Sequence, residues 1–203
     1  EALQQAQQAS GLTQVTLGTT TWDLAQRVYV MGILNVTPDS FSDGGMYLHP
    51  EQAWKHAETM LAEGADLIDV GGESSRPWAQ PVPVAVEYER VVPVVRELVK
   101  RYGAVVSVDT YRASVAAAAL DEGAVLINDI SALRFDARMA PLLARRGAAV
   151  VLMHMQGNPQ IMQRAPTYRQ VVEEVYAFLA TRLEYAVQSG IPRRHIFLDP
   201  GFG

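Results

Sequence analysis

The amino-acid sequence predicts an α/β protein whose parallel sheet closes as a (β/α)8 barrel. A unit of helix, glycine, short apolar strand and polar loop repeats along most of the chain, which predicts parallel strands joined by right-handed crossovers. Polar residues follow nearly every strand, as in barrels, where the site is built from many loops. No strand is followed by a GxGxxG or GxxxxGK[ST] motif, which disfavours an open, nucleotide-binding sheet.

The repeat defines a cap and one domain. Residues 1–27 are expected to form a tail and a small β-hairpin, with strands 13–17 and 20–25 around Gly18. The remaining strands are predicted at residues 28–34, 66–70, 104–108, 125–128, 149–153 and 195–198. Helices are predicted at residues 50–63, 84–102, 112–122, 136–146 and 168–189, each ended by a glycine. The first strand shows little alternation and should be covered on both faces.

Residues 28–203 therefore contain six strand–loop units of a single barrel domain. A complete eight-unit barrel needs about 250 residues. We expect that the last two units are missing, or that the given sequence is a fragment of a longer chain.

Composition narrows the class of protein. The chain has 203 residues, 49% of them hydrophobic and 19% charged, which is an ordinary globular balance. No apolar run reaches the roughly 18 residues that would cross a membrane, and residues 1–11 do not resemble a signal peptide. The absence of cysteine excludes disulfides and thiolate metal sites and fits a cytoplasmic location. A net charge of −5 argues against nucleic-acid binding.

Acids and amides gather where the predicted strands end. They are Asn35, the run from Gly71 to Arg76, Asp109, Asn128 with Asp129, His154 with Gln156, and Asp199. In a parallel barrel these positions converge on one rim. Each has a structural explanation of its own: a helix cap for Asp109, a turn for Asp129 and Asp199, and a core position for His154. Their recurrence at successive strand ends favours a binding site.

The residue types indicate the ligand. Asp and Asn side chains together match a flat heterocycle that carries N–H and C=O groups. Ser75 and Arg76, on a glycine-rich loop, suit a phosphate. Asn35 offers an oxygen to Mg²⁺, which usually accompanies a diphosphate. The loop acids Asp39 and Asp43 are expected to pair with Arg76 when the loop closes.

Six motifs resemble those of dihydropteroate synthases in order and spacing. They are MGILNVTPDSFSDGG (31–45), GGESSRP (71–77), SVDTYR (107–112), INDIS (127–131), VLMHMQG (151–157) and LDPGFG (198–203). The resemblance implies a barrel enzyme of folate biosynthesis. That family condenses 6-hydroxymethyl-7,8-dihydropterin diphosphate with 4-aminobenzoate, giving dihydropteroate and pyrophosphate.

The resemblance also implies roles for single residues. Asp109, Asn128 and Asp199 would line the pterin pocket, and Met153 would pack beside the ring. Asn35 would contact the metal-bound diphosphate, and Ser75 and Arg76, where the family usually has Thr-Arg, would bind phosphate. Pro77 and two mobile loops, residues 36–48 and 72–82, would form the aminobenzoate site.

The family's reaction is dissociative. Arg76 and Mg²⁺ would stabilise the leaving diphosphate, and Asp109 and Asp199 would stabilise the pterin cation. A homodimer in the cytoplasm and competition by sulfonamides are expected on the same basis. The late lysine, arginine and histidine of the family have no counterpart in this sequence.

Two other interpretations remain open. One is the related pterin-binding domain of corrinoid-dependent methyltransferases, which needs neither a diphosphate nor an aminobenzoate site. The loop after Asn35 and the Ser75–Arg76–Pro77 run disfavour it. The other is a non-catalytic pterin-binding protein. Release of pyrophosphate distinguishes both from the synthase.

Overall fold

A computed structural model describes residues 13–37, 50–73, 81–157 and 166–202. Its centre is a six-stranded parallel sheet in which each strand pairs with the next one along the chain. The strands are β3 (Met31–Asn35), β4 (Leu67–Gly71), β5 (Val106–Asp109), β6 (Leu126–Asp129), β7 (Ala149–Met153) and β8 (Ile196–Asp199). This is the order of successive strands in a (β/α)8 barrel, as the sequence predicts. A separate antiparallel hairpin, β1 (Gln14–Leu17) and β2 (Thr20–Asp23), confirms the predicted cap.

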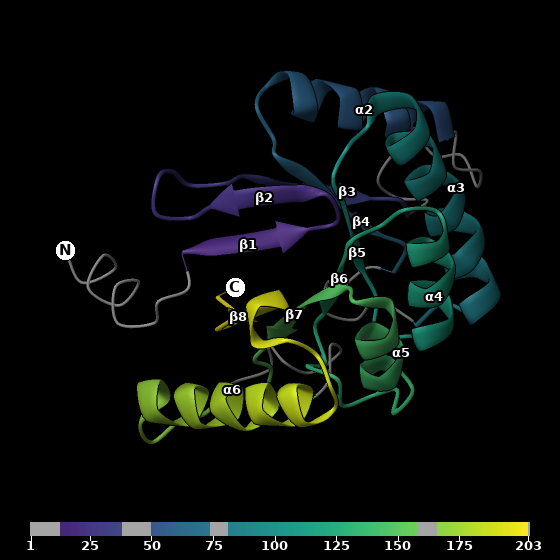
Figure 1. Cartoon of the computed structure of the whole chain (residues 1–203). Coiled ribbons are helices and arrows are strands. Elements are labelled where there is room, and N and C mark those ends of the chain that lie inside the picture. The colour runs from purple at the N-terminus through teal and green to yellow at the C-terminus, as the bar shows by residue number, and fades with distance from the viewer. Residues whose placement is uncertain (1–12, 38–49, 74–80, 158–165, 203) are drawn as a thin grey trace.

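Helices connect the strands and lie together around one side of the sheet, with the hairpin on the other side (Figure 1). They are α2 (Pro50–Ala62), α3 (Val84–Tyr102), α4 (Ala113–Asp121), α5 (Met139–Arg146), α6 (Val171–Gln188) and the short 3₁₀ helix η2 (Arg193–His195). Each predicted glycine stop, from Gly64 to Gly190, has a positive φ, which confirms the glycine stops. Helices α2, α4 and α6 end one residue earlier than predicted. No helix within the described ranges is long and apolar enough to cross a membrane.

Residues alternate between the two faces of the sheet. Leu34, Ile68, Val70, Val108 and Val150 belong to the main core beneath the helices. The other face carries a second, smaller core near the start of the strands, which includes Leu67, Leu126 and Ala149 from the sheet and Val15, Leu17 and Trp22 from the hairpin. The hairpin therefore packs against the first residues of the strands, at the N-terminal end of the sheet. An apolar cavity of about 340 Å³ lies there.

The first strand differs from its prediction. It begins at Met31, and Val28 and Val30 before it are exposed. Ile33 is 56% exposed whereas Leu34 is fully buried. The expected cover on both faces is therefore wrong in this structure. The physical reason is position: β3 pairs only with β4 and forms one edge of the described sheet, so its inner face lacks a neighbour on one side.

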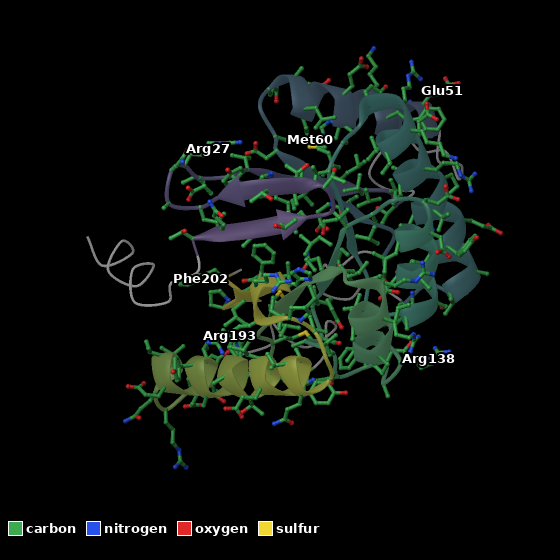
Figure 2. All side chains as sticks on the ribbon, in the orientation of Figure 1. Arg27, Glu51, Met60, Arg138, Arg193 and Phe202 are labelled. Carbon is green, nitrogen blue, oxygen red and sulfur yellow. The ribbon has the colours of Figure 1, made fainter. Side chains whose placement is uncertain are left out.

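Gly32 allows α2 to lie close to this edge strand. A Cβ atom on Gly32 would stand 2.9 Å from Met60 Sδ, closer than real Cβ atoms approach, and 3.1 Å from Ile68 Cδ1, which is tighter than most real contacts. Figure 2 labels Met60 on α2, above the sheet. A glycine in the strand thus permits the close contact between α2 and β3.

Candidate functional site

Three of the predicted site residues lie in one row at the C-terminal end of the sheet. Asn35 pairs with Gly71, Gly71 with Asp109, and Asp109 with Asn128. A Cβ atom on Gly71 would lie 3.5 Å from Asn35 Oδ1 and 3.6 Å from Asp109 Oδ2. The side chains of Asn35 and Asp109 therefore border the bare glycine between them. The predicted convergence of polar strand ends is confirmed for this row.

Asp109 is held in a position where its negative charge is disfavoured. Burial is the largest cause that raises its pKa well above the ordinary value, and the carboxylates of Asp69 and Glu87 raise it further. A ligand that donates hydrogen bonds or develops positive charge next to Asp109 would relieve this repulsion. The row is thus suited to an electron-poor, hydrogen-donating ligand.

Asn128 is hydrogen-bonded to an acid in the middle of β4. Its Nδ2 donates to Asp69 Oδ2 at 2.9 Å. Asp69 is 3% exposed, and burial raises its pKa, while Ser107 and Asn128 act in the opposite direction. Sequence reasoning missed Asp69, because it took the whole of LIDVG as scaffold; the one signal was an acid within an otherwise apolar strand.

Met153 and Asp199 lie side by side at the ends of β7 and β8. Asp199 Oδ1 accepts the Gly201 N–H at 2.7 Å, and the Asp199 carbonyl accepts the His154 N–H at 2.8 Å. Gly201 has a φ of 73°, and a Cβ there would lie 2.3 Å from the His154 carbonyl oxygen. One carboxylate oxygen of Asp199 is therefore used in a turn, as the turn interpretation predicts. Asp199 is half-buried and lies on β8, at the other edge of the sheet.

His154 and Asp129 have structural partners. His154 is buried, and its ring meets Phe178 edge-on with centroids 5.0 Å apart. Burial lowers the pKa of His154, which keeps the ring neutral near pH 7. Asp129 Oδ1 accepts from the Ser131 N–H and hydroxyl, and Oδ2 accepts from the Leu133 N–H. Both residues therefore shape the loops rather than face a ligand.

A buried network that the sequence did not reveal joins the end of β4 to α3 and to the residues after β5. Arg112 Nη2 donates to Glu73 Oε2 at 2.8 Å and to the Val82 carbonyl at 2.9 Å. Arg112 Nη1 pairs with Glu87, which is 2% exposed, and the Tyr111 hydroxyl donates to Glu73 Oε1 at 2.6 Å. Glu73 and Val82 flank the segment with the SSRP run, so one guanidinium holds both of its ends.

Some predicted site residues lie outside the described residues. These are Asp39, Asp43, Ser75, Arg76 and Pro77. The start of the first predicted mobile loop is described and differs from the expectation. Val36 is 1% exposed and donates its N–H to the Gly71 carbonyl at 2.8 Å, and Thr37 is also buried. Val36 belongs to the main core, because the β3–β4 ladder continues beyond the strand.

The metal prediction depends on Asn35. Among the described residues there is no group of three His, Cys, Asp or Glu side chains that could hold a metal ion. Asn35 is exposed at the end of β3 and offers a single amide oxygen. That fits Mg²⁺, which keeps several waters and is often bound mainly by substrate phosphates.

Comparison with known proteins gives consistent matches. Residues 31–203 match the family model described as pterin binding enzyme. A dihydropteroate synthase of Mycobacterium leprae is 50% identical over 177 residues, covering 87% of this chain and 62% of that protein. The solved dihydropteroate synthase of Yersinia pestis, in complex with a sulfonamide drug, is 46% identical with a TM-score of 0.86 and covers 94% and 68% of the two chains. That of Xanthomonas albilineans, with 4-aminobenzoic acid, is 44% identical with a TM-score of 0.85 and covers 94% and 67%.

This chain spans less than two thirds of the length of the curated relatives it matches; for a Streptococcus pyogenes dihydropteroate synthase the share is 63%. The match nevertheless includes all six strands of the sheet and the row at their C-terminal ends. The sequence motifs, the strand order and these comparisons agree, and the chain belongs to the pterin binding enzyme family.

Proposed function

We propose that this chain carries the pterin site of a dihydropteroate synthase. The reaction joins 6-hydroxymethyl-7,8-dihydropterin diphosphate to 4-aminobenzoate and releases pyrophosphate. The observation that carries the proposal is the row of Asn35, Asp109 and Asn128, held in register around Gly71 at the C-terminal end of the sheet. The names of the similar proteins support the same activity.

The row would bind the pterin through its hydrogen-bonding edge. Asn128 has one side of its amide bound to Asp69, and no described residue forms a hydrogen bond with the other side. Asp109 would accept from a ring N–H. Asp199 would act from β8, at the other edge of the sheet, with Met153 of β7 beside the ring. When diphosphate leaves, positive charge develops on the pterin. Asp109, whose charge is disfavoured without a partner, would stabilise that charge electrostatically.

Asn35 would hold the diphosphate end of the substrate. Its oxygen would bind Mg²⁺, which supplies charge stabilisation for the leaving diphosphate. From the sequence, Ser75 and Arg76 would bind phosphate oxygens. Arg112 and Glu73 would keep the two ends of that segment together, and Pro77, Asp39 and Asp43 would belong to the loops around the aminobenzoate.

Two further parts of the proposal come from the family resemblance. The enzyme is expected to be a homodimer and to act in the cytoplasm. Light scattering of the full-length protein tests the first: a mass of one protomer at micromolar concentration would contradict it.

The activity is tested by measuring pyrophosphate release from the full-length protein with the pterin diphosphate, 4-aminobenzoate and Mg²⁺. We expect release that depends on both substrates and is inhibited by a sulfonamide in competition with 4-aminobenzoate. A reaction without 4-aminobenzoate is the control. Tight pterin binding without pyrophosphate release would reject the synthase and favour a non-catalytic pterin-binding protein or a methyltransferase domain.

A further inference from the structure

Asp69 is a buried acid to which none of the roles above is assigned. It lies in β4 between Ile68 and Val70, both fully buried, and is itself 3% exposed. Burial is the main cause that raises its pKa. A buried carboxylate lowers stability compared with an apolar side chain of similar size. Its position is therefore better explained by what it contacts than by packing.

The contact is with Asn128. Asn128 Nδ2 lies 2.9 Å from Asp69 Oδ2, which is the length of a good charge-assisted hydrogen bond. The other oxygen of Asp69, Oδ1, is buried and has no hydrogen-bond partner among the residues that the structure describes. The neighbouring Ser107 hydroxyl favours the ionised form of Asp69 but does not reach hydrogen-bonding geometry with a described residue. Asn128 is thus the described residue whose side chain is hydrogen-bonded to the Asp69 carboxylate.

This bond decides which way the amide of Asn128 faces. An amide has a donor side and an acceptor side of nearly equal shape, and either can be turned toward a neutral partner. An ionised carboxylate only accepts hydrogen bonds. In the structure Asn128 directs its NH₂ group to Asp69, and this bond favours the ionised form of Asp69 against the effect of burial. The Asn128 Oδ1 is thereby turned away from Asp69.

We propose that Asp69 is a positioning residue: it orients the Asn128 amide so that Oδ1 is presented to the ligand as a hydrogen-bond acceptor for a ring N–H or amino group. The identity of the ligand as a pterin rests on the proposed function. Asn128 lies directly opposite Asp109 in the ladder. The two side chains then offer neighbouring acceptors, which match a heterocycle with adjacent donors on one edge.

The test measures pterin affinity of the folded, full-length protein by calorimetry. In Asp69→Asn the partner can donate or accept, so the Asn128 amide is free to turn, and we expect about tenfold weaker binding, which corresponds to about 1.4 kcal/mol. The double variant Asp69→Asn with Asn128→Asp restores a donor–carboxylate pair with an acceptor facing the ligand. We expect it to bind pterin more tightly than either single variant.

Asp121→Asn is the matched control, because it makes the same change to an exposed acid at the end of α4. Its pterin affinity should equal that of the unaltered protein. Native-like pterin binding by a folded Asp69→Asn variant would overturn the proposal. A double variant that binds no better than Asn128→Asp would also overturn it.

A measurement on the unaltered protein decides the question if Asp69→Asn does not fold. The Asn128 side-chain NH₂ resonances are assigned by NMR from their loss in Asn128→Asp. We expect one of the two protons to exchange slowly with solvent in the ligand-free protein, because it is bonded to Asp69. Two rapidly exchanging protons would reject the positioning role. This measurement does not use pyrophosphate release. Failure of the synthase assay would reject the proposed function but would not affect this test of Asp69.

Discussion

The two ends of the same strands have opposite characters. At the N-terminal end, Leu67 and Leu126 pack with Leu17 and Trp22 of the hairpin. At the C-terminal end the sheet presents Asn35, Asp109 and Asn128. In β6, Leu126 and Asn128 are successive residues on the same face of the strand, about 6.6 Å apart along it, and the face changes from apolar to polar between them. Apolar burial and ligand chemistry are therefore separated within each strand.

The separation has an energetic consequence. Apolar side chains at the hairpin end stabilise the fold when they leave water. Asp69 and Asp109 at the other end have raised pKa values because burial disfavours their charges. Residues near the site thus lower stability, and the opposite end compensates. Substitutions at the two ends should therefore separate activity from stability.

Asp109→Asn should show the largest effect, which is a loss of activity without a loss of stability. The substitution keeps the shape but removes the charge that would stabilise the pterin cation, so we expect kcat/KM to fall by at least about 100-fold. Stability should be unchanged or higher, because an unfavourable buried charge is lost. Pyrophosphate release and urea unfolding measure the two quantities.

The control for this variant is Asp121→Asn, an exposed acid at the end of α4 that pairs with Arg146. It should keep full activity. An Asp109→Asn enzyme within threefold of native kcat/KM would show that Asp109 is not part of the catalytic machinery.

The regular pattern of this fold could be predicted from sequence, and the exact strand ends could not. Helix α3 has its predicted bounds, Val84 to Tyr102, and Gly103 ends it in the left-handed conformation. Most strands, however, extend one residue past the prediction and include Asn35, Gly71, Asp109, Asp129 and Asp199. A backbone ladder does not require apolar side chains, so a polar residue that was expected to begin the loop still pairs in the strand.

The predicted starts of α5 and α6 are wrong, because an acid near each start accepts N–H groups of residues that precede the helix. Helix α5 was predicted from Asp136 but begins at Met139, because the Asp136 carboxylate accepts the N–H groups of Arg138 and Ala113 and remains outside the helix. Helix α6 was predicted from residue 168 but begins at Val171. The Glu174 carboxylate accepts the N–H groups of Arg169 and Gln170, which precede the helix.

Side-chain contacts around the site between residues far apart in the sequence could not be predicted from the sequence. The convergence of Asn35, Asp109 and Asn128 follows from strand order, and it was predicted. The bonds of Arg112 to Glu73 and Glu87 join residues 39 and 25 positions apart, and no local pattern marks such a pair. The pairing of Asp69 with Asn128 is of the same kind.

Leu17→Ala, at the hairpin end, should have the next largest effect, and on stability alone. Leu17 is 2% exposed and lines the apolar cavity between hairpin and sheet. We expect the free energy of unfolding to fall by about 2 kcal/mol, at the low end for a buried leucine because an adjacent cavity already limits its contacts. Pterin affinity of the folded protein should not change; a loss of affinity would show that the two ends are coupled.

The smallest effect, and the sharpest contrast between the ends, is the sign of the pH dependence of stability. Asp109 has a raised pKa, so the folded protein binds its proton more tightly than the unfolded chain does. The free energy of unfolding therefore falls as pH rises from the unfolded value near 3.9 to the raised folded value. Asp109→Asn removes that fall, so its stability relative to the native protein should increase from about pH 4 upward.

Asp66, just before β4 at the hairpin end, should show the opposite sign. Its hydrogen bond from Arg27 is the main cause that lowers its pKa, and Arg27 Nη2 lies 2.6 Å from Asp66 Oδ1. That contribution to stability is present above the unfolded pKa and is lost as pH falls through the folded value. Asp66→Asn should thus be less stable than the native protein at pH 7 and equal to it in acid. Urea unfolding of both variants between pH 3 and 8 tests the contrast, and pH dependences of the same sign would contradict the assignment of an electrostatically favourable end and an unfavourable one.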